Sequence, residues 1–133
     1  MAGLLTHLIV ASIGFLIGMF IFKNYKYGLA FMFGHVIPDI IDFGIIGLFS
    51  WEFNPSIIML SPWFRSLAVL GHTWGYWIVF GIIVFLIAFF LYKIGKISNK
   101  TFKIIFFALL FFLAGVGVHL VLDILIIETS SWI

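Results

Sequence analysis

The chain has 133 residues, of which 65% are hydrophobic, 20% aromatic and only 9% charged. Such a composition excludes a water-soluble globular domain and predicts an integral membrane protein. The net charge of +2 comes with seven Lys and Arg residues, which in an apolar chain set membrane topology rather than bind nucleic acid. The lack of cysteine excludes disulfides, thiolate metal sites and cysteine nucleophiles.

Four apolar segments are long enough to cross a bilayer, which takes about 20 residues per helix. We expect transmembrane helices at residues 4–22, 28–49, 67–92 and 104–127. The first segment has neither a basic start nor a small-residue cleavage site, so we interpret it as a retained helix rather than a signal peptide. Residues 51–65 contain two prolines and predict a connecting loop. The predicted fold is therefore an all-α polytopic membrane protein with four transmembrane helices in a single domain, residues 1–133.

The basic residues predict how the chain is oriented in the membrane. Six lysines fall in two loops, at residues 23–27 and 93–103, whereas Arg65 lies in the loop on the opposite side. Because cytoplasmic loops are enriched in Lys and Arg, we place the two lysine loops in the cytoplasm and both termini outside. The chain is then a multi-pass protein of the cell (cytoplasmic) membrane.

All four histidines and three of the five acidic residues lie inside predicted spans. These seven residues are His7, His35, Asp39, Asp42, His72, His119 and Asp123. A charged residue at bilayer depth costs at least about 2.5–3.5 kcal/mol, so seven such groups indicate a common purpose. Counted from the external ends of the spans, six of them lie in the outer half of the bilayer, and His35 lies about one helical turn deeper.

The spacing of these residues places them on shared helical faces. His35 precedes Asp39 by four residues, and Asp42 follows Asp39 by three. The fourth span carries a second pair of this kind, His119 and Asp123. Two such faces can meet across a helical bundle. Proline at position 38 removes a backbone hydrogen bond and is expected to kink or unwind the second span beside this face.

Imidazole and carboxylate ligands without sulfur suit zinc, manganese, iron or a similar divalent ion. A single tetrahedral ion needs three or four ligands. Seven candidates therefore allow two ions about 3.5–4 Å apart, or one ion whose ligands are oriented by further carboxylates. We predict an intramembrane His/Asp metal site that opens toward the external leaflet, at the depth of lipid phosphates and ester linkages.

Four motifs carry a family resemblance, and they span nearly the whole chain. They are Thr6-His7, the Pro-Asp segment from Gly34 to Asp42, Gly71-His72-Thr73, and the segment from Gly117 to Asp123. In this order they resemble the small membrane-bound metal-dependent hydrolases of the YdjM type. That family is distantly similar to zinc-dependent phospholipase C and P1-type nucleases, which are helical enzymes that cleave phosphoesters with a cluster of zinc ions.

The resemblance implies a set of metal ligands and a reaction. The implied ligands are His7, Asp39, His72, His119 and Asp123. The expected function is a membrane-embedded metal-dependent hydrolase that uses metal-activated water, with zinc as the expected ion. Its expected substrate is a phosphoester of a membrane lipid or a lipid-linked molecule. As catalytic residues we expect Asp42 to relay a proton, His35 to support the site, and Arg65 to neutralise developing charge.

Three other interpretations stay open at this point. A b-type haem could use His7 and His72 as axial ligands, although this leaves three buried Asp residues unexplained. Chains of His and Asp also mark ion pathways, but the cytoplasmic halves of the first, third and fourth spans contain no such groups. The chain could also be a non-catalytic subunit of a larger membrane complex.

Overall fold

The computed structural model describes residues 4–125, and all regular structure in that range is helical, as predicted. The elements in chain order are α1 (Leu4–Phe20), α2 (Tyr25–Asp39), the π-helical turn η1 (Ile40–Gly44), α3 (Ile45–Ser50), α4 (Pro55–Ile58), α5 (Phe64–His72), α6 (Trp74–Lys93) and α7 (Asn99–Leu125). Because α2, η1 and α3 follow one another directly, they form one long irregular helix.

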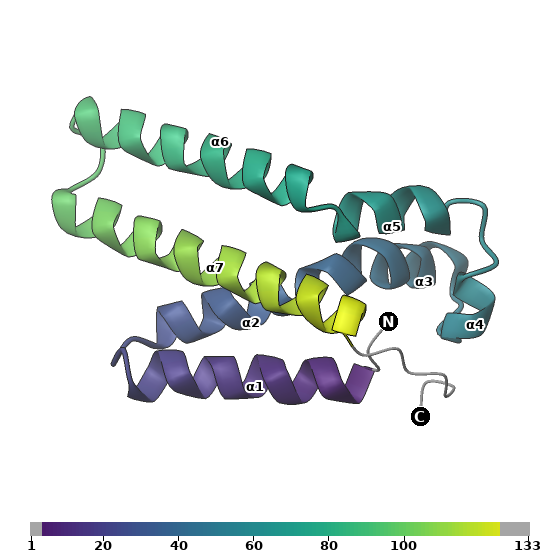
Figure 1. Ribbon diagram of the computed structural model, residues 1–133. Helices are drawn as coiled ribbons and strands as arrows, with labels where there is room; N and C mark the ends of the chain where they lie inside the picture. Colours follow the sequence, from purple (N-terminus) through teal and green to yellow (C-terminus); the bar gives the residue numbers. More distant parts are fainter. Residues whose placement is uncertain (1–3, 126–133) are drawn as a thin grey trace.

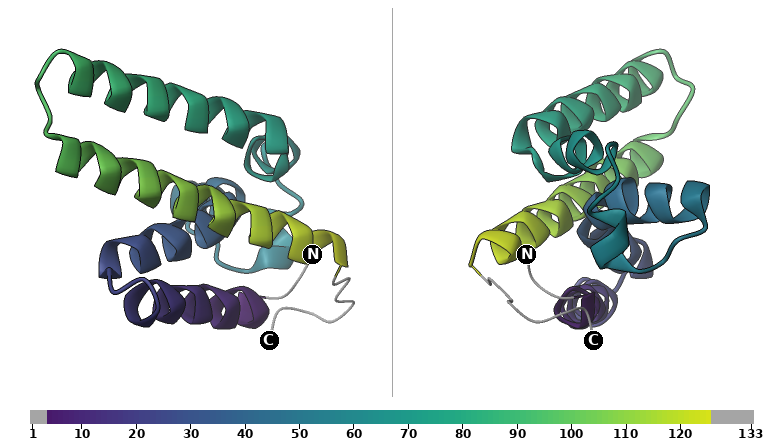
Figure 2. Two further views of the ribbon diagram at one scale, coloured as in Figure 1. Left: turned by 60° about the vertical axis from the view of Figure 1, so that its left-hand side comes forward. Right: turned by 90° about the vertical axis from the view of Figure 1, so that its right-hand side faces the viewer.

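The long helices pack as neighbours in a layered bundle. Helix α7 packs against both α2 and α6, while α1 lies on the side of α2 that faces away from α6 (Figure 1). Two further views show the same order of helices (Figure 2). The packed core centres on Trp77 of α6 with Val116 and Leu120 of α7. This core joins α6 to α7 next to the segment of α7 that carries His119.

Two glycines allow α2 and α7 to approach closely. A Cβ atom on Gly34 would collide with the backbone oxygen of Phe112, and one on Gly115 would collide with the backbone oxygen of Phe31. Small residues at such crossings are typical of helices that associate within membranes. The contact fixes the part of α2 that carries His35 against the part of α7 that carries His119.

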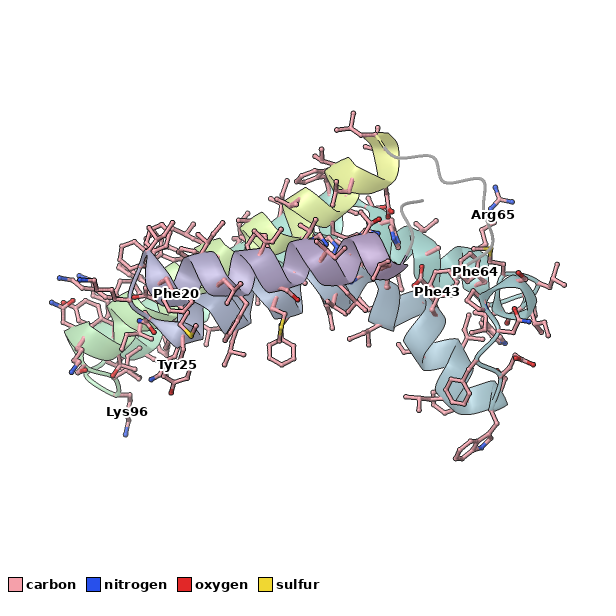
Figure 3. The ribbon with its side chains drawn as sticks, turned by 90° about the horizontal axis from the view of Figure 1, so that it is seen from below. Phe20, Tyr25, Phe43, Phe64, Arg65 and Lys96 are labelled. Carbon is pink, nitrogen blue, oxygen red and sulfur yellow. The ribbon has the colours of Figure 1, made fainter. Side chains whose placement is uncertain are left out.

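The two turns that contain lysines lie at one end of the molecule. The α1–α2 and α6–α7 connections are together there, and the beginning of α1 and the end of α7 lie at the other end (Figure 1). Lys96 and Arg65 lie at opposite ends (Figure 3). The lysine turns therefore share one side of the molecule, and the assignment of that side to the cytoplasm stays a prediction.

Three helical segments are long and apolar enough to cross a membrane, namely Tyr25–Ser50, Trp74–Lys93 and Asn99–Leu125. Helix α1 is also apolar but has 17 described residues and is shorter than these three. The structure is therefore compatible with a membrane protein in which three helices have the length of a span.

The third predicted helix is interrupted and the fourth begins earlier than predicted, while the predicted end of the fourth, at residue 127, lies outside the described residues. The helix expected over residues 67–92 is divided into α5 and α6, because Thr73 between them has an extended backbone. The indole N–H of Trp77 donates to the carbonyl of Gly71 at 2.7 Å, which satisfies one of the carbonyl groups that the break exposes. Helix α7 begins at Asn99, so part of the predicted lysine loop is helical.

The irregularity expected at Pro38 takes the form of a π-helical turn. Pro38 lies inside α2, and η1 begins two residues later. Its ring crowds the carbonyl of the preceding turn and it has no N–H to donate, so the regular α-helical pattern is disturbed there. A π turn often marks a functional site. The loop expected over residues 51–65 contains the short helix α4 and the start of α5.

Helix α5 ends directly against this irregular region. A Cβ atom on Gly71 would lie 2.8 Å from the backbone oxygen of Pro38, too close for any residue other than glycine without a shift. This contact brings His72, the last residue of α5, next to the α2 segment that carries Asp39.

Candidate metal centre

The structure brings all seven predicted intramembrane His and Asp residues into one cluster. They come from four parts of the chain: α1 contributes His7, α2 and η1 contribute His35, Asp39 and Asp42, α5 contributes His72, and α7 contributes His119 and Asp123. The cluster lies toward the end of the molecule where α1 begins and α7 ends. It is almost completely enclosed, since four of its members have relative exposures of 2% or less.

Four donor atoms from different side chains converge on one point of this cluster. Asp123 Oδ2 lies 3.1 Å from His72 Nε2 and 3.3 Å from His119 Nε2. The two Nε2 atoms are 3.3 Å apart. Asp39 Oδ1 is 3.5 Å from His119 Nε2 and 3.8 Å from His72 Nε2.

These separations match the edges of a tetrahedral metal site. Zinc bonds to nitrogen and oxygen are about 2.0–2.2 Å long, so neighbouring ligand atoms of a tetrahedral site lie about 3.3–3.6 Å apart. The five distances above, from 3.1 to 3.8 Å, scatter around that value. Buried His and Asp groups with this geometry can hold a metal ion, and Asp39, His72 and His119 form one such group.

A second group of potential ligands shares His119 with the first. It consists of His7, His35 and His119, which are all buried. His7 Nδ1 and His35 Nε2 are 3.2 Å apart, and the rings of His7 and His119 stack with their centroids 4.1 Å apart. His119 Nδ1 is buried and has no hydrogen-bond partner. The cluster thus offers donor atoms for a second ion beside the first.

In His7 and His35 the second ring nitrogen is held by an acceptor. His35 Nδ1 lies 3.2 Å from the carbonyl oxygen of Gly115, and His7 Nε2 lies 3.2 Å from Asp123 Oδ1. If both nitrogens donate, the proton-free nitrogens of His7 and His35 are the two that face each other. A ligand histidine in a metalloprotein commonly donates its other ring N–H to a carbonyl or carboxylate in this way.

His72 has the same arrangement on the other side of the cluster. Its Nδ1 lies 3.3 Å from the carbonyl oxygen of Ala68 and 3.5 Å from Asp42 Oδ2, which leaves Nε2 to face His119 and Asp123. Asp42 therefore lies behind the His72 ring. It is wholly buried, and its position suits a group that orients His72 rather than one that contacts a substrate.

The charge of the cluster also favours a cation. Asp39 and Asp42 form no ion pair with Lys or Arg within residues 4–125, and the Lys and Arg side chains of this range are all exposed. Asp39 Oδ1 and Asp42 Oδ2 are buried without a hydrogen bond to any residue of this range. Buried carboxylates are costly unless they are paired or coordinate a metal, so a divalent ion would compensate both.

Arg65, the predicted charge-neutralising residue, is not part of the cluster. It lies in the first turn of α5, two turns away from His72, and its side chain is exposed. In Figure 3 it points away from the helices at the end of the molecule beside Phe64.

Two orienting groups were not predicted, the backbone carbonyls of Ala68 and Gly115. Ala68 lies four residues before His72, whose ring it holds, and this spacing could have indicated it. Gly115 holds His35 across the contact between α2 and α7, which has no local signal.

The proposed haem site does not fit this arrangement. The carboxylate of Asp123 lies between the two histidines that would be axial ligands, since Oδ1 is 3.2 Å from His7 Nε2 and Oδ2 is 3.1 Å from His72 Nε2. A porphyrin between these rings would need the space that the carboxylate occupies.

Comparison of the chain with protein-family models, with curated proteins and with solved structures finds no match. The function must therefore be inferred from the site itself.

Proposed function

We propose that the protein is a membrane-embedded hydrolase that depends on a divalent metal ion, with zinc as the expected ion. The observation that carries the proposal is the convergence of Asp39, His72, His119 and Asp123 at the spacing of a tetrahedral site. The absence of sulfur ligands and the mixture of imidazole and carboxylate support a metal used for hydrolysis.

Each residue of the cluster has a role in this proposal. Asp39, His72, His119 and Asp123 hold the ion, while His7 and His35 extend the ligand set toward a second one. The bound metal supplies Lewis-acid activation of water and compensates the charge that develops on a phosphoester. Asp42 orients His72, instead of relaying a proton, because it lies 3.5 Å behind that ring. Arg65 has no place at the reacting bond because it lies outside the cluster.

A phosphoester of a lipid or a lipid-linked molecule is the proposed substrate class. The cluster lies toward one end of apolar helices, where a membrane would place its headgroup region. The resemblance to metal-dependent hydrolases of the YdjM type favours a phosphoester over a carboxylic ester. A substrate of this kind reaches the cluster from the bilayer without leaving it.

The proposal includes α1 as a fourth span and an external location of the cluster. The 17 described residues of α1 lie at the lower limit for a helix that crosses a bilayer. Because the chain has no cysteine, single cysteines can be introduced at position 24 and at position 54 without background labelling. In intact cells, a membrane-impermeant maleimide should label Asn54→Cys and not Asn24→Cys. The reverse pattern would refute the orientation.

Metal analysis combined with a hydrolysis assay tests the function. Purified protein should contain at least one zinc or similar ion per chain and should release a headgroup from phospholipid vesicles. His119→Ala should lose both the metal and the hydrolysis, whereas the control Ser12→Ala, an exposed polar change in α1, should keep both. Full hydrolysis by metal-free protein would refute the proposal, and a Soret band in the absorption spectrum would indicate haem instead.

A further inference from the structure

An apolar groove begins at the cluster and leads away from it. The groove has a volume of about 270 Å³, and among the described residues that line it only His7 and Asp39 are polar. Both belong to the cluster, one to each of the two ligand groups. The other lining residues within 4–125 are apolar or glycine. The groove therefore joins a reactive polar centre to a hydrocarbon-like surface.

The walls of the groove come from three parts of the chain. Leu8 of α1 forms one side, and the α2–η1 segment forms another with Ile40, Phe43 and Gly44. The Phe43 ring is fixed against Phe64, with ring centroids 5.0 Å apart, near the beginning of α1 (Figure 3). The π turn thus supplies Asp42 to the cluster and also forms part of this wall.

The far wall is formed by Phe53, Pro55 and Ile58 from the segment around α4. The rim of the groove is apolar and open to the outside, since Leu8 and Ile40 have relative exposures of 47% and 43%. In a membrane such a rim contacts hydrocarbon chains. A larger cavity of about 660 Å³ lies between α3 and α5, but none of the seven cluster residues lines it, so it offers no route to the metal ligands.

We propose that this groove binds a hydrocarbon chain of the substrate and selects lipids by that chain. This inference rests on the proposed function, and it identifies Leu8, Phe43 and Gly44 as specificity-determining residues. The occupant is a chain from the bilayer because the groove is apolar along its length and polar only where it meets the cluster. The phosphoester of a substrate whose chain lies in the groove is then beside His7 and Asp39.

Two variants narrow the groove from opposite sides. Gly44→Leu adds a side chain whose Cβ would meet only Ile40, at 3.3 Å or more, so the addition extends along the groove wall. Leu8→Trp enlarges the wall that α1 supplies. The matched control is Gly75→Leu, because a Cβ at Gly75 meets nothing within 4 Å and the residue lines no part of the groove.

The probes are the methyl and dodecyl diesters of p-nitrophenyl phosphate, with protein in phosphatidylcholine nanodiscs. Each buried methylene of the probe changes its binding constant roughly fourfold. Each groove variant should displace two or three methylenes of the dodecyl chain, so the dodecyl-to-methyl ratio of kcat/KM should fall about tenfold or more. Gly75→Leu should leave the ratio unchanged. If wild-type protein hydrolyses both probes and neither variant changes the ratio, the groove inference is wrong while the hydrolase stands.

A second measurement does not depend on activity. A dodecyl phosphodiester with a terminal diazirine should photo-crosslink to Phe53 or Ile58 in metal-stripped protein, and Gly44→Leu should abolish this crosslink. If wild-type protein hydrolyses neither probe but gives this crosslink, the proposed function fails and the groove inference stands. Crosslinks only at other helices, at residues 126–133 or to a second copy of the chain would overturn the inference.

Discussion

In the proposed site Asp42 orients His72, whereas Asp39, three residues earlier, is a metal ligand. Asp42 Oδ2 lies 3.5 Å from His72 Nδ1, on the side of the ring that faces away from the other ligands, whereas Asp39 Oδ1 faces the Nε2 atoms of His72 and His119. Asp42→Asn removes a charge and preserves volume. We therefore expect it to weaken metal binding without changing the number of bound ions.

The expected size of this effect follows from the contacts of the His72 ring. Loss of an orienting partner typically lowers metal affinity about 10- to 100-fold. At 3.5 Å the contact of Asp42 is longer than a good hydrogen bond, and the carbonyl of Ala68 still holds the same nitrogen at 3.3 Å. The loss should therefore lie near the lower limit, about tenfold, which corresponds to about 1.4 kcal/mol.

Competition with a chromophoric zinc chelator measures the affinity, and elemental analysis measures the stoichiometry. Asp39→Asn is the matched comparison, because it changes a carboxylate by the same amount at a ligand position. It should reduce affinity much more than Asp42→Asn does. Equal losses in the two variants would show that Asp42 is itself a ligand, and no loss in Asp42→Asn would show that the contact with His72 is unimportant.

Three other substitutions test which residues around the cluster support its structure. Gly115→Val should destabilise the protein by about 1–3 kcal/mol, because a side chain there meets the backbone of α2. The control Gly75→Val should not destabilise it, because a Cβ at Gly75 meets nothing within 4 Å. Unfolding in detergent measures the stability of both variants. Trp77→Phe should lower the unfolding midpoint, because it leaves the buried carbonyl of Gly71 without its donor at a cost of about 1–3 kcal/mol; an unchanged midpoint would contradict this. Arg65→Gln should leave the metal content unchanged, and a loss of metal would show that Arg65 supports the cluster.

The composition of the cluster could be predicted from the sequence because two simple rules apply within a membrane. Ionisable groups are costly there, so His and Asp inside apolar segments stand out. The helical period then places residues such as His119 and Asp123 on one face. Depth counted along antiparallel helices placed six of them in the outer half of the bilayer and His35 about one turn deeper, and the structure brings all seven together.

The details that could not be predicted depend on contacts between distant segments. The break at Thr73 is stabilised by Trp77 and by the packing of Gly71 on Pro38, and neither contact has a local signature in a continuous apolar run. The role of Asp42 depends on which nitrogen of His72 it faces, which spacing along α2 does not determine. Arg65 was chosen for its charge, but the direction of α5 places it away from the cluster.

The cluster also bears on what holds the helices together at this end of the molecule. Apolar helices gain little from the hydrophobic effect when their alternative neighbours are lipid chains, so close packing and polar contacts must supply the specificity. Gly34 and Gly115 supply close packing between α2 and α7, and Gly71 supplies it between α5 and α2. The cluster adds polar contacts to this packing, because Asp123 of α7 meets both His7 of α1 and His72 of α5. Because ligands from four segments converge, binding of a metal ion favours the arrangement that creates the site. The same residues that would serve hydrolysis therefore also define the packing of the bundle around them.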